Sequence, residues 1–192
     1  MSYYPPKINE ISRAARHCGV AVAADAEGRT ANFECGSFVS VSMKIGSESG
    51  VIEDIRYVTN GCAYLISAAE ILAEIMMGRA LTELHGMDRN ELLATLTREI
   101  DAIPSARIHC ADTVIDAFHT ALADYRIRRI DEFSGEKALI CTCFGISDDA
   151  LADCISQKHL STVTEVAAIC RAGSGCGSCQ PLIQEMIDEA IR

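Results

Sequence analysis

Two groups of cysteines constrain this chain more than any other feature of its sequence. The chain has ten cysteines among 192 residues, fewer than the roughly 8–10% that is typical of a small disulfide scaffold. Four of them form a C-x-C pair and a C-x-x-C pair near the C-terminus, namely Cys141, Cys143, Cys176 and Cys179. Three others stand singly and far apart, at Cys35, Cys62 and Cys110. Clustered and isolated cysteines of this kind more often serve metal or redox chemistry than disulfides in a reducing compartment.

Composition narrows the functional classes. The first ten residues, MSYYPPKINE, contain no apolar segment typical of a secretory signal, and no apolar run approaches the length of a membrane helix. We therefore expect a cytoplasmic protein that does not bind a membrane. The formal net charge of −10 lacks the basic footprint of a nucleic-acid binder, so we expect no nucleic-acid partner.

The C-terminal cysteine set indicates a metal centre. Four thiolates suit an all-cysteine zinc site or an iron–sulfur cluster. The second pair lies in a glycine-rich segment, Ala172–Gln180 (AGSGCGSCQ), where backbone N–H groups can approach sulfur and tune a cluster. Zinc and fortuitous burial of the four cysteines stay open as alternatives.

The three single cysteines have a second kind of local setting. Cys62 and Cys110 each stand where a helix is expected to begin, and a helix N-terminus lowers the pKa of a thiol. We therefore expect both to be thiolates near neutral pH. His109 adjoins Cys110 and is a candidate fourth ligand or proton carrier, although it could equally cap or solvate the helix. Cys154 and Cys170 fall inside expected helices and are interpreted as small core residues.

Hydrophobic periodicity predicts an α+β first half. Residues 39–45 alternate apolar and polar as in a half-buried strand, residues 46–50 (GSESG) form a turn, and residues 51–58 predict a second strand of a hairpin. Helical spacing follows over residues 64–77, 89–100 and 111–128. Strands followed by helices indicate a small antiparallel sheet with helices on one face.

The second half is predicted to be a small all-α domain. Ser147 is a candidate N-cap for a helix over residues 148–157, Thr162 and Glu165 have the spacing of a capping box, and Pro181 stands early in a third helix. A polar stretch containing Ser-Gly separates the halves. We therefore predict domains at 1–130 and 138–192, joined by a linker at 131–137.

At these cysteines the chain resembles a known family. The first half is similar to the NifU/IscU iron–sulfur cluster assembly scaffold; the matching stretches are Cys35-Gly36, residues 50–54 (GVIED) leading to Gly61-Cys62, and residues 107–110 (RIHC). The second half resembles the bacterioferritin-associated-ferredoxin type of [2Fe–2S] domain; its matching stretches are residues 141–147 (CTCFGIS) and 175–179 (GCGSC). NifU has the same order of domains, and only 13 residues follow Cys179, so the thioredoxin-like third domain of NifU is not expected.

The resemblance implies a role for each cysteine of the two sets. Cys35, Cys62 and Cys110 would hold a transient [2Fe–2S] or [4Fe–4S] cluster, with Cys110 as first persulfide acceptor, His109 as auxiliary ligand and zinc as a possible occupant. The C-x-C and C-x-x-C cysteines would hold a permanent [2Fe–2S] cluster that supplies electrons. A cysteine desulfurase, apo iron–sulfur proteins and an electron donor are the implied partners, and a homodimer is expected.

Two departures from the family pattern bear on this resemblance. Ser37 stands where the family has an Asp linked to cluster turnover, and residues 103–107 (IPSAR) replace its chaperone motif. The sequence thus predicts a non-enzymatic cluster assembly scaffold. The rival interpretations are an electron-transfer [2Fe–2S] protein and a zinc-binding regulatory module.

Overall fold

The chain forms two compact units, which we describe separately. A computed structural model describes residues 3–47, 49–84, 87–100, 103–131, 138–175 and 177–190. The first unit contains Met1–Ala80 and Met87–Tyr125, and the second contains Leu81–Gly86 and Arg126–Arg192.

The first unit is built on a three-stranded antiparallel sheet in the order β1-β2-β3. Its strands are β1 (Ala26–Asn32), β2 (Ser37–Ile45) and β3 (Ile52–Thr59), and Val41 at the centre of β2 lies opposite Gly28 and Tyr57. The predicted hairpin is therefore confirmed as β2 and β3. The sequence did not predict β1, because its residues, AEGRTAN, show little apolar alternation.

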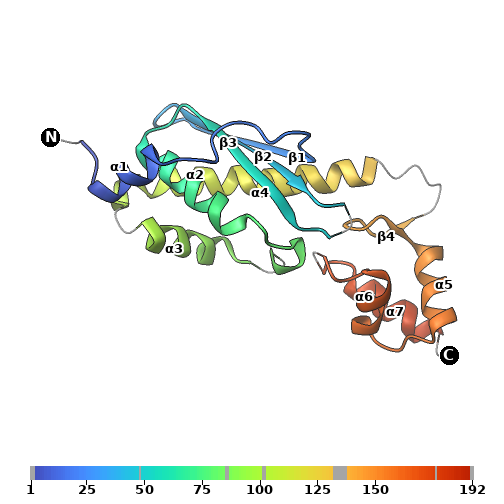
Figure 1. Cartoon of the computed structure of the whole chain (residues 1–192). Coiled ribbons are helices and arrows are strands. Elements are labelled where there is room, and N and C mark those ends of the chain that lie inside the picture. The colour runs from blue at the N-terminus through green and yellow to red at the C-terminus, as the bar shows by residue number, and fades with distance from the viewer. Residues whose placement is uncertain are drawn as a thin grey trace. The chain divides into compact units, whose positions relative to one another are not determined.

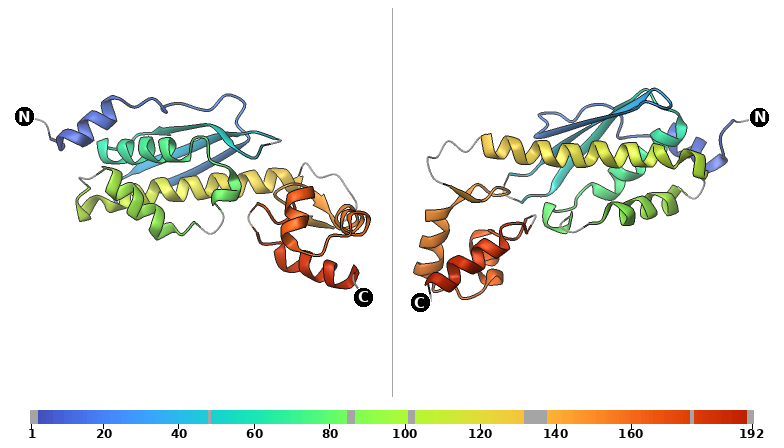
Figure 2. Two further views of the ribbon diagram at one scale, coloured as in Figure 1. Left: turned by 60° about the horizontal axis from the view of Figure 1, so that its bottom comes forward. Right: turned by 180° about the vertical axis from the view of Figure 1, so that it is seen from behind.

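One face of the sheet is covered by helices, as predicted (Figures 1 and 2). Val39, Val41 and Met43 on alternate positions of β2 are at most 2% exposed. They face the core with α2 (Ala63–Met76) and α4 (Ile108–Asp131). Close approach of β1 to α4 requires Gly28, since a Cβ atom there would overlap the backbone of α4 at Ala117 and Ala121.

Shorter helices complete the first unit. These are α1 (Pro6–Arg13), α3 (Arg89–Ile100) and the 3-10 turn η2 (Ser105–Arg107); the 3-10 turn η1 (Leu81–Leu84) falls in the second unit. α1 and α3 pack against α2. The predicted bounds of α2 and α3 hold to within a residue, α1 was not predicted, and α4 begins three residues earlier than expected, with Cys110 inside its first turn.

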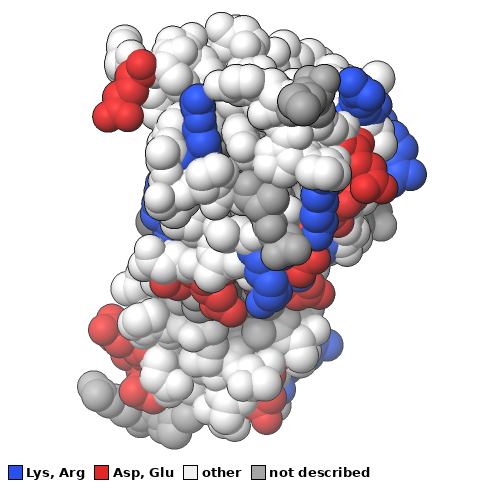
Figure 3. Space-filling model, turned by 90° about the vertical axis from the view of Figure 1, so that its left-hand side faces the viewer, with Lys and Arg blue, Asp and Glu red and all other residues white. Residues whose placement is uncertain are grey.

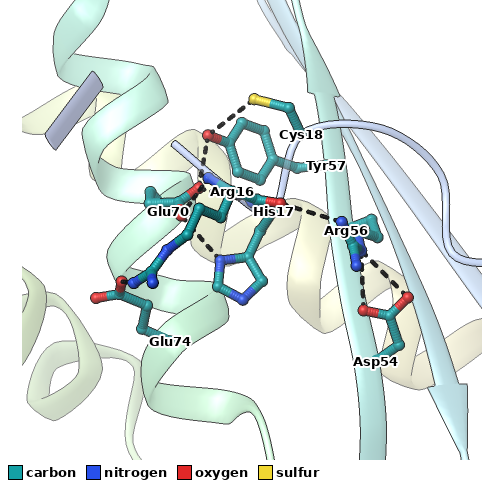
Figure 4. A network of polar contacts seen from close by, with 8 residues as sticks. All are labelled: Arg16, His17, Cys18, Asp54, Arg56, Tyr57, Glu70 and Glu74. Atoms are coloured by element: carbon teal, nitrogen blue, oxygen red, sulfur yellow. Dashed lines mark hydrogen bonds and ion pairs between the residues drawn. The ribbon is translucent and has the colours of Figure 1, made fainter. Parts of the chain in front are cut away.

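A buried carboxylate joins α2 to the segment that follows α1 (Figure 4). Glu70 is 3% exposed, and it accepts hydrogen bonds from the backbone N–H of Arg16 (2.7 Å) and of His17 (3.2 Å) and from the Tyr57 hydroxyl (3.1 Å). The His17 Nδ1 atom lies 2.9 Å from the same carboxylate. Burial raises the pKa of the Glu70 carboxyl, but the hydrogen bonds from Arg16, His17 and Tyr57 outweigh it and hold the pKa below its usual value.

We expect the substitution Glu70→Gln to lower the free energy of unfolding by about 2–3 kcal/mol at pH 7, because the amide keeps only one acceptor oxygen and its NH2 group would face the remaining donors. A carboxyl with a depressed pKa stabilises the fold above its unfolded pKa of about 4.3 and loses this contribution as the pH falls below that value. The difference between wild type and variant should therefore shrink below about pH 4.3.

Glu74→Gln is the matched control on the same helix. Glu74 forms an ion pair with Arg16 at 3.2 Å, and the two side chains are 41% and 79% exposed, so its loss should cost less than about 1 kcal/mol. Chemical denaturation from pH 3 to pH 7 measures both variants, and equal losses at pH 7 would contradict the stabilising role of Glu70.

The second unit is mostly helical, as predicted, with a short hairpin that was not predicted. Its elements are β4 (Leu139–Cys141), β5 (Ile146–Ser147), α5 (Asp148–Lys158), α6 (Val163–Cys170) and α7 (Gln180–Ala190). Ser147 caps α5, and the capping box of Thr162 and Glu165 begins α6. Buried residues from all three helices and from the hairpin form one small core.

Residues 132–137 of the predicted linker lie outside the described residues, and Asp131 ends α4. None of the helices in the described part of the chain combines the length and the apolar character needed to cross a bilayer. On the face shown in Figure 3, basic and acidic side chains are interspersed.

Candidate functional site

The first candidate site is a pair of thiols at the starts of two helices. Cys62 is the N-cap of α2, with an extended backbone, and Cys110 lies in the first turn of α4. Their sulfur atoms are 3.9 Å apart. Gly61 permits this turn into α2, because a Cβ atom there would lie 2.9 Å from Cδ1 of Leu65.

Burial controls the ionisation of Cys110. The residue is 1% exposed, and burial, followed by the nearby Cys62 thiol, raises its pKa to about 12. The expectation that a helix N-terminus would make Cys110 a thiolate is therefore wrong, because the cost of burying a charge exceeds the favourable interaction with the helix dipole. A cation at this site would favour the thiolate by displacing the proton.

Cys35 differs from Cys110 in both exposure and ionisation. It is exposed in the turn between β1 and β2, where its backbone N–H donates to the Asn32 side chain over 3.2 Å. Its sulfur lies 2.9 Å from the Ser37 hydroxyl oxygen. The hydrogen bond from Ser37 is the main cause that lowers the pKa of Cys35, and the positive charge of Arg107 lowers it further.

His109, which precedes Cys110 in the sequence, has a ring nitrogen that lacks a hydrogen-bond partner among the described residues. Its Nε2 atom is buried and has no hydrogen-bond partner among the described residues. A buried polar atom without a partner is costly, and a neutral imidazole nitrogen is a good ligand for a metal ion. The atom is thus suited to coordination.

The structure brings some of the four predicted residues together. Cys62 and Cys110 form a pair, and Cys35 is near enough for its charge to raise the pKa of Cys110. Within the described ranges, no three His, Cys, Asp or Glu side chains are grouped closely enough to hold a metal ion. Sequence reasoning gave Arg107 no role, although its charge acts on both Cys35 and Cys110; its position two residues before His109 was the available signal.

The second candidate site gathers cysteines from the hairpin and from the start of α7. Cys141 ends β4, Cys143 lies in the turn to β5, and Cys179 immediately precedes α7. All three are buried, at 2%, 9% and 6% exposure. The predicted ligand Cys176 lies outside the described residues.

Hydrogen bonds to sulfur favour the thiolate at Cys141. Its pKa is lowered first by the side chain of Cys143 and then by the backbone of Gly173 and Phe144, against the effects of burial and of the Cys179 charge. Backbone donors to a buried thiolate are the surroundings that an iron–sulfur cluster requires.

Close packing of the glycine-rich segment shapes this second site. A Cβ atom on Gly175 would lie 2.8 Å from Cβ and 2.9 Å from the sulfur of Cys143, and 3.2 Å from the Phe144 ring. The Arg171 guanidinium stacks 4.1 Å above the same ring. Buried thiols with backbone donors, and a glycine that approaches Cys143 this closely, suit a [2Fe–2S] cluster, although Cys141, Cys143 and Cys179 do not by themselves form a closed metal-ligand group among the described residues.

Comparison with protein families decides the identity of both units. The family described as NifU-like N terminal domain matches residues 3–132. The chain belongs to this family. The BFD-like [2Fe-2S] binding domain matches residues 139–189, so the NifU-like part is followed by a domain of a type that binds an iron–sulfur cluster.

Two named proteins and one solved structure illustrate what the chain is similar to. A nitrogen fixation protein NifU from Nostoc sp. is 30% identical over 97% of this chain and 61% of its own length. The iron-sulfur cluster assembly scaffold protein IscU from Aquifex aeolicus is 28% identical over 62% of this chain and 74% of its own. The crystal structure of a nitrogen-fixing NifU-like protein (N-terminal) from Brucella abortus matches with a TM-score of 0.49 and 18% identity, over 65% of this chain and 94% of that one. The chain spans about 60% of the length of the NifU relatives that it matches.

Proposed function

We propose that this chain is a scaffold on which iron–sulfur clusters are built from sulfur and iron and then passed to apo-proteins. The observation that carries the proposal is the preformed pair of Cys62 and Cys110, 3.9 Å apart, in the part of the chain that matches the NifU-like family. We assign Cys35 and His109 as the further ligands of the transient cluster. In this proposal the scaffold domain comprises residues 1–130, the [2Fe–2S] domain comprises residues 138–192, and residues 131–137 form the linker.

The differing exposure of the cysteines suggests how sulfur enters. A persulfide donor must reach a thiolate, which takes the terminal sulfur and leaves the donor as a thiolate. Cys35 is exposed and its pKa is lowered, whereas Cys110 is 1% exposed and its pKa is raised. We therefore assign Cys35 as the first acceptor in place of Cys110, with a cysteine desulfurase, the sulfur donor that the family implies, as partner.

The second site supports a resident cluster. Cys141, Cys143, Cys176 and Cys179 would hold a [2Fe–2S] cluster, which when bound supplies single electrons for the reduction of sulfane sulfur to sulfide. Gly173 and Phe144 orient the Cys141 thiolate through their N–H groups, and burial of the ligands limits access of water. The resident cluster would in turn be reduced by an external electron donor. That the chain forms a homodimer stays a prediction.

The test is to build and transfer a cluster with the full chain. Anaerobic protein is incubated with ferrous iron, cysteine, a cysteine desulfurase and a reductant, and then with an apo-ferredoxin. We expect about two irons per chain that resist transfer and a further labile cluster that activates the acceptor. If only non-transferable iron is bound, the electron-transfer interpretation replaces the scaffold. A colourless protein holding zinc in its C-terminal half would overturn the resident cluster.

Ser37 offers a test of cluster release in the same assay. Its hydroxyl is 2.9 Å from the Cys35 sulfur, so Ser37→Asp would replace a hydrogen-bond donor by a negative charge beside the ligand. We expect cluster transfer to become about tenfold faster, which corresponds to about one lost charge-assisted hydrogen bond. Ser37→Ala, which removes the donor without adding charge, should give a smaller acceleration. An unchanged or slower rate in Ser37→Asp would remove Ser37 as a determinant of turnover.

A further inference from the structure

The turn that carries Cys35 has almost no core packing to hold it in place. Residues 33–36 are all exposed, and Ser37 is the first buried residue that follows them. Cys62 and Cys110, by contrast, stand at the starts of α2 and α4. A ligand in an exposed turn keeps one position only where hydrogen bonds restrain the backbone around it. The hydrogen bonds of this turn therefore decide where the Cys35 sulfur lies.

Asn32 holds the turn from the side of β1. Its side-chain oxygen accepts hydrogen bonds from the backbone N–H groups of Glu34 (2.9 Å) and Cys35 (3.2 Å). Asparagine commonly forms such bonds with the residues that follow it. Because they run within the connection between β1 and β2, these bonds shape the turn without tying it to another ligand.

Asn60 holds the same turn from the side of β3. The pairing of β3 with β2 ends at Thr59, after which the chain continues to Cys62. The Asn60 side chain reaches back to β2: its oxygen accepts from the Phe38 N–H over 2.8 Å, and its nitrogen donates to the Gly36 carbonyl over 3.3 Å. An amide side chain carries both a donor and an acceptor. Asn60 thus supplies both kinds of bond that a further residue of a paired strand would supply.

Thr59 adds a second link between the two turns. Its hydroxyl donates to the Phe38 carbonyl and accepts from the Gly61 N–H over 2.9 Å. Gly61 directly precedes Cys62, the N-cap of α2. The backbone that follows Cys35 is therefore bonded to the residues that lead into Cys62. Neither Thr59 nor Asn60 was assigned a role from the sequence.

We propose that Asn60, assisted by Thr59, is a positioning residue of the transient-cluster site, which fixes the turn of Cys35 relative to Cys62. We call these two side chains the turn clamp. The inference rests on the proposed scaffold function and concerns the same site. Because the turn clamp bonds to backbone rather than to sulfur, it should control how long a cluster is held. It should not limit how much cluster is built when iron and sulfur are in excess.

Amide hydrogen exchange on the full-length chain tests the restraint before any labile cluster is built. Asn60→Ala removes both bonds of the amide, and Thr59→Val removes the hydroxyl while keeping a branched side chain. We expect the N–H groups of residues 34–38 to exchange about five- to tenfold faster in both variants, because opening of the turn then breaks fewer hydrogen bonds.

Two further variants serve as controls for the turn clamp. Thr59→Ser keeps the hydroxyl and should exchange at the wild-type rate. Asn9→Ala is the matched control for Asn60→Ala, because the Asn9 amide also donates to the backbone, at the carbonyls of Tyr4 (2.8 Å) and Pro5 (3.4 Å). Its loss should leave exchange of residues 34–38 unchanged.

Release of the labile cluster tests the functional consequence. Each variant is loaded with excess ferrous iron, cysteine and a cysteine desulfurase, and iron is then extracted with a chelator. We expect equal loading but about tenfold faster loss of transferable iron in Asn60→Ala and Thr59→Val, the lower end of the effect of losing a group that orients a metal ligand. Thr59→Ser and Asn9→Ala should release iron at the wild-type rate. Iron in the C-terminal half should be extracted equally from all of them, because its cysteines lie in the second unit.

The two measurements separate this inference from the scaffold proposal on which it rests. Unchanged release in Asn60→Ala would overturn the positioning role, even if the turn exchanged faster. Faster exchange throughout the first unit would also overturn it, because the effect would then be a general loss of stability. Thr59→Ser that released iron as fast as Thr59→Val would remove Thr59 from the turn clamp. A wild-type chain that builds no labile cluster would count against the scaffold proposal, whereas exchange of residues 34–38 would still decide whether Asn60 holds the turn.

Discussion

Replacing Cys110 by alanine should reduce building of the transferable cluster by more than about 100-fold, beyond the usual effect of losing a residue that only supports a metal ligand. The variant lacks one member of the pair whose sulfur atoms are 3.9 Å apart. No other cysteine among the described residues adjoins Cys62 in the same way. The C-terminal cluster should keep its visible spectrum, because its cysteines lie in the second unit with a core of their own.

Two further variants separate coordination from folding. Cys35→Ala should abolish transferable cluster as well, although Cys35 is exposed and its loss removes no core contact. Cys18→Ala removes another exposed cysteine, which hydrogen-bonds Tyr57, and should build clusters at the wild-type rate. Because Cys110 is buried, thermal unfolding of the Cys110→Ala variant is measured in parallel. Wild-type rates of building and transfer in both Cys35→Ala and Cys110→Ala would contradict the assembly site.

Strong periodic signals explain which parts of the fold could be predicted from sequence. The alternation along β2 and the helical spacing of α2 and α3 reflect burial of one face, and the structure places these elements within a few residues of the prediction. β1 was not predicted because its inward positions hold Ala26 and Gly28, which are small enough for α4 to approach but give no strong apolar signal. The hairpin of β4 and β5 pairs only three and two residues, too few for a period of two to emerge.

The sequence predicted which residues belong to the candidate sites, but it could not predict how their thiols ionise. The positions of Cys62 and Cys110 at helix starts follow from the sequence, and the structure agrees. The raised pKa of Cys110 does not follow, because it depends on tertiary burial rather than on the local helix.

Gly175→Ala should remove the C-terminal cluster while leaving the fold of the second unit in place. The added Cβ atom would lie 2.8 Å from Cβ and 2.9 Å from the sulfur of Cys143. Escape is restricted on the other side, where the Phe144 ring would lie 3.2 Å away and is itself held by Arg171. The displaced atom is a candidate ligand, so an overpacking cost of about 1–3 kcal/mol should lower iron occupancy of this site by about 10- to 100-fold at limiting iron.

Gly145→Ala is the matched control, because it separates backbone strain from displacement of the ligand. Gly145 lies in the turn between β4 and β5, which also holds Cys143. Its φ is +64°, and a Cβ atom there would meet nothing within 4 Å. The control should therefore cost about 1 kcal/mol of stability through strain and still bind its cluster. Iron, sulfide and visible absorbance after reconstitution measure the two variants, with thermal unfolding to compare their stability. Full loading of Gly175→Ala would mean that the cluster ligands do not depend on close approach of this glycine, whereas loss in both variants would attribute the effect to the turn. Only selective loss in Gly175→Ala supports a cluster cradle in which the missing side chain of a glycine sets the position of a neighbouring thiolate.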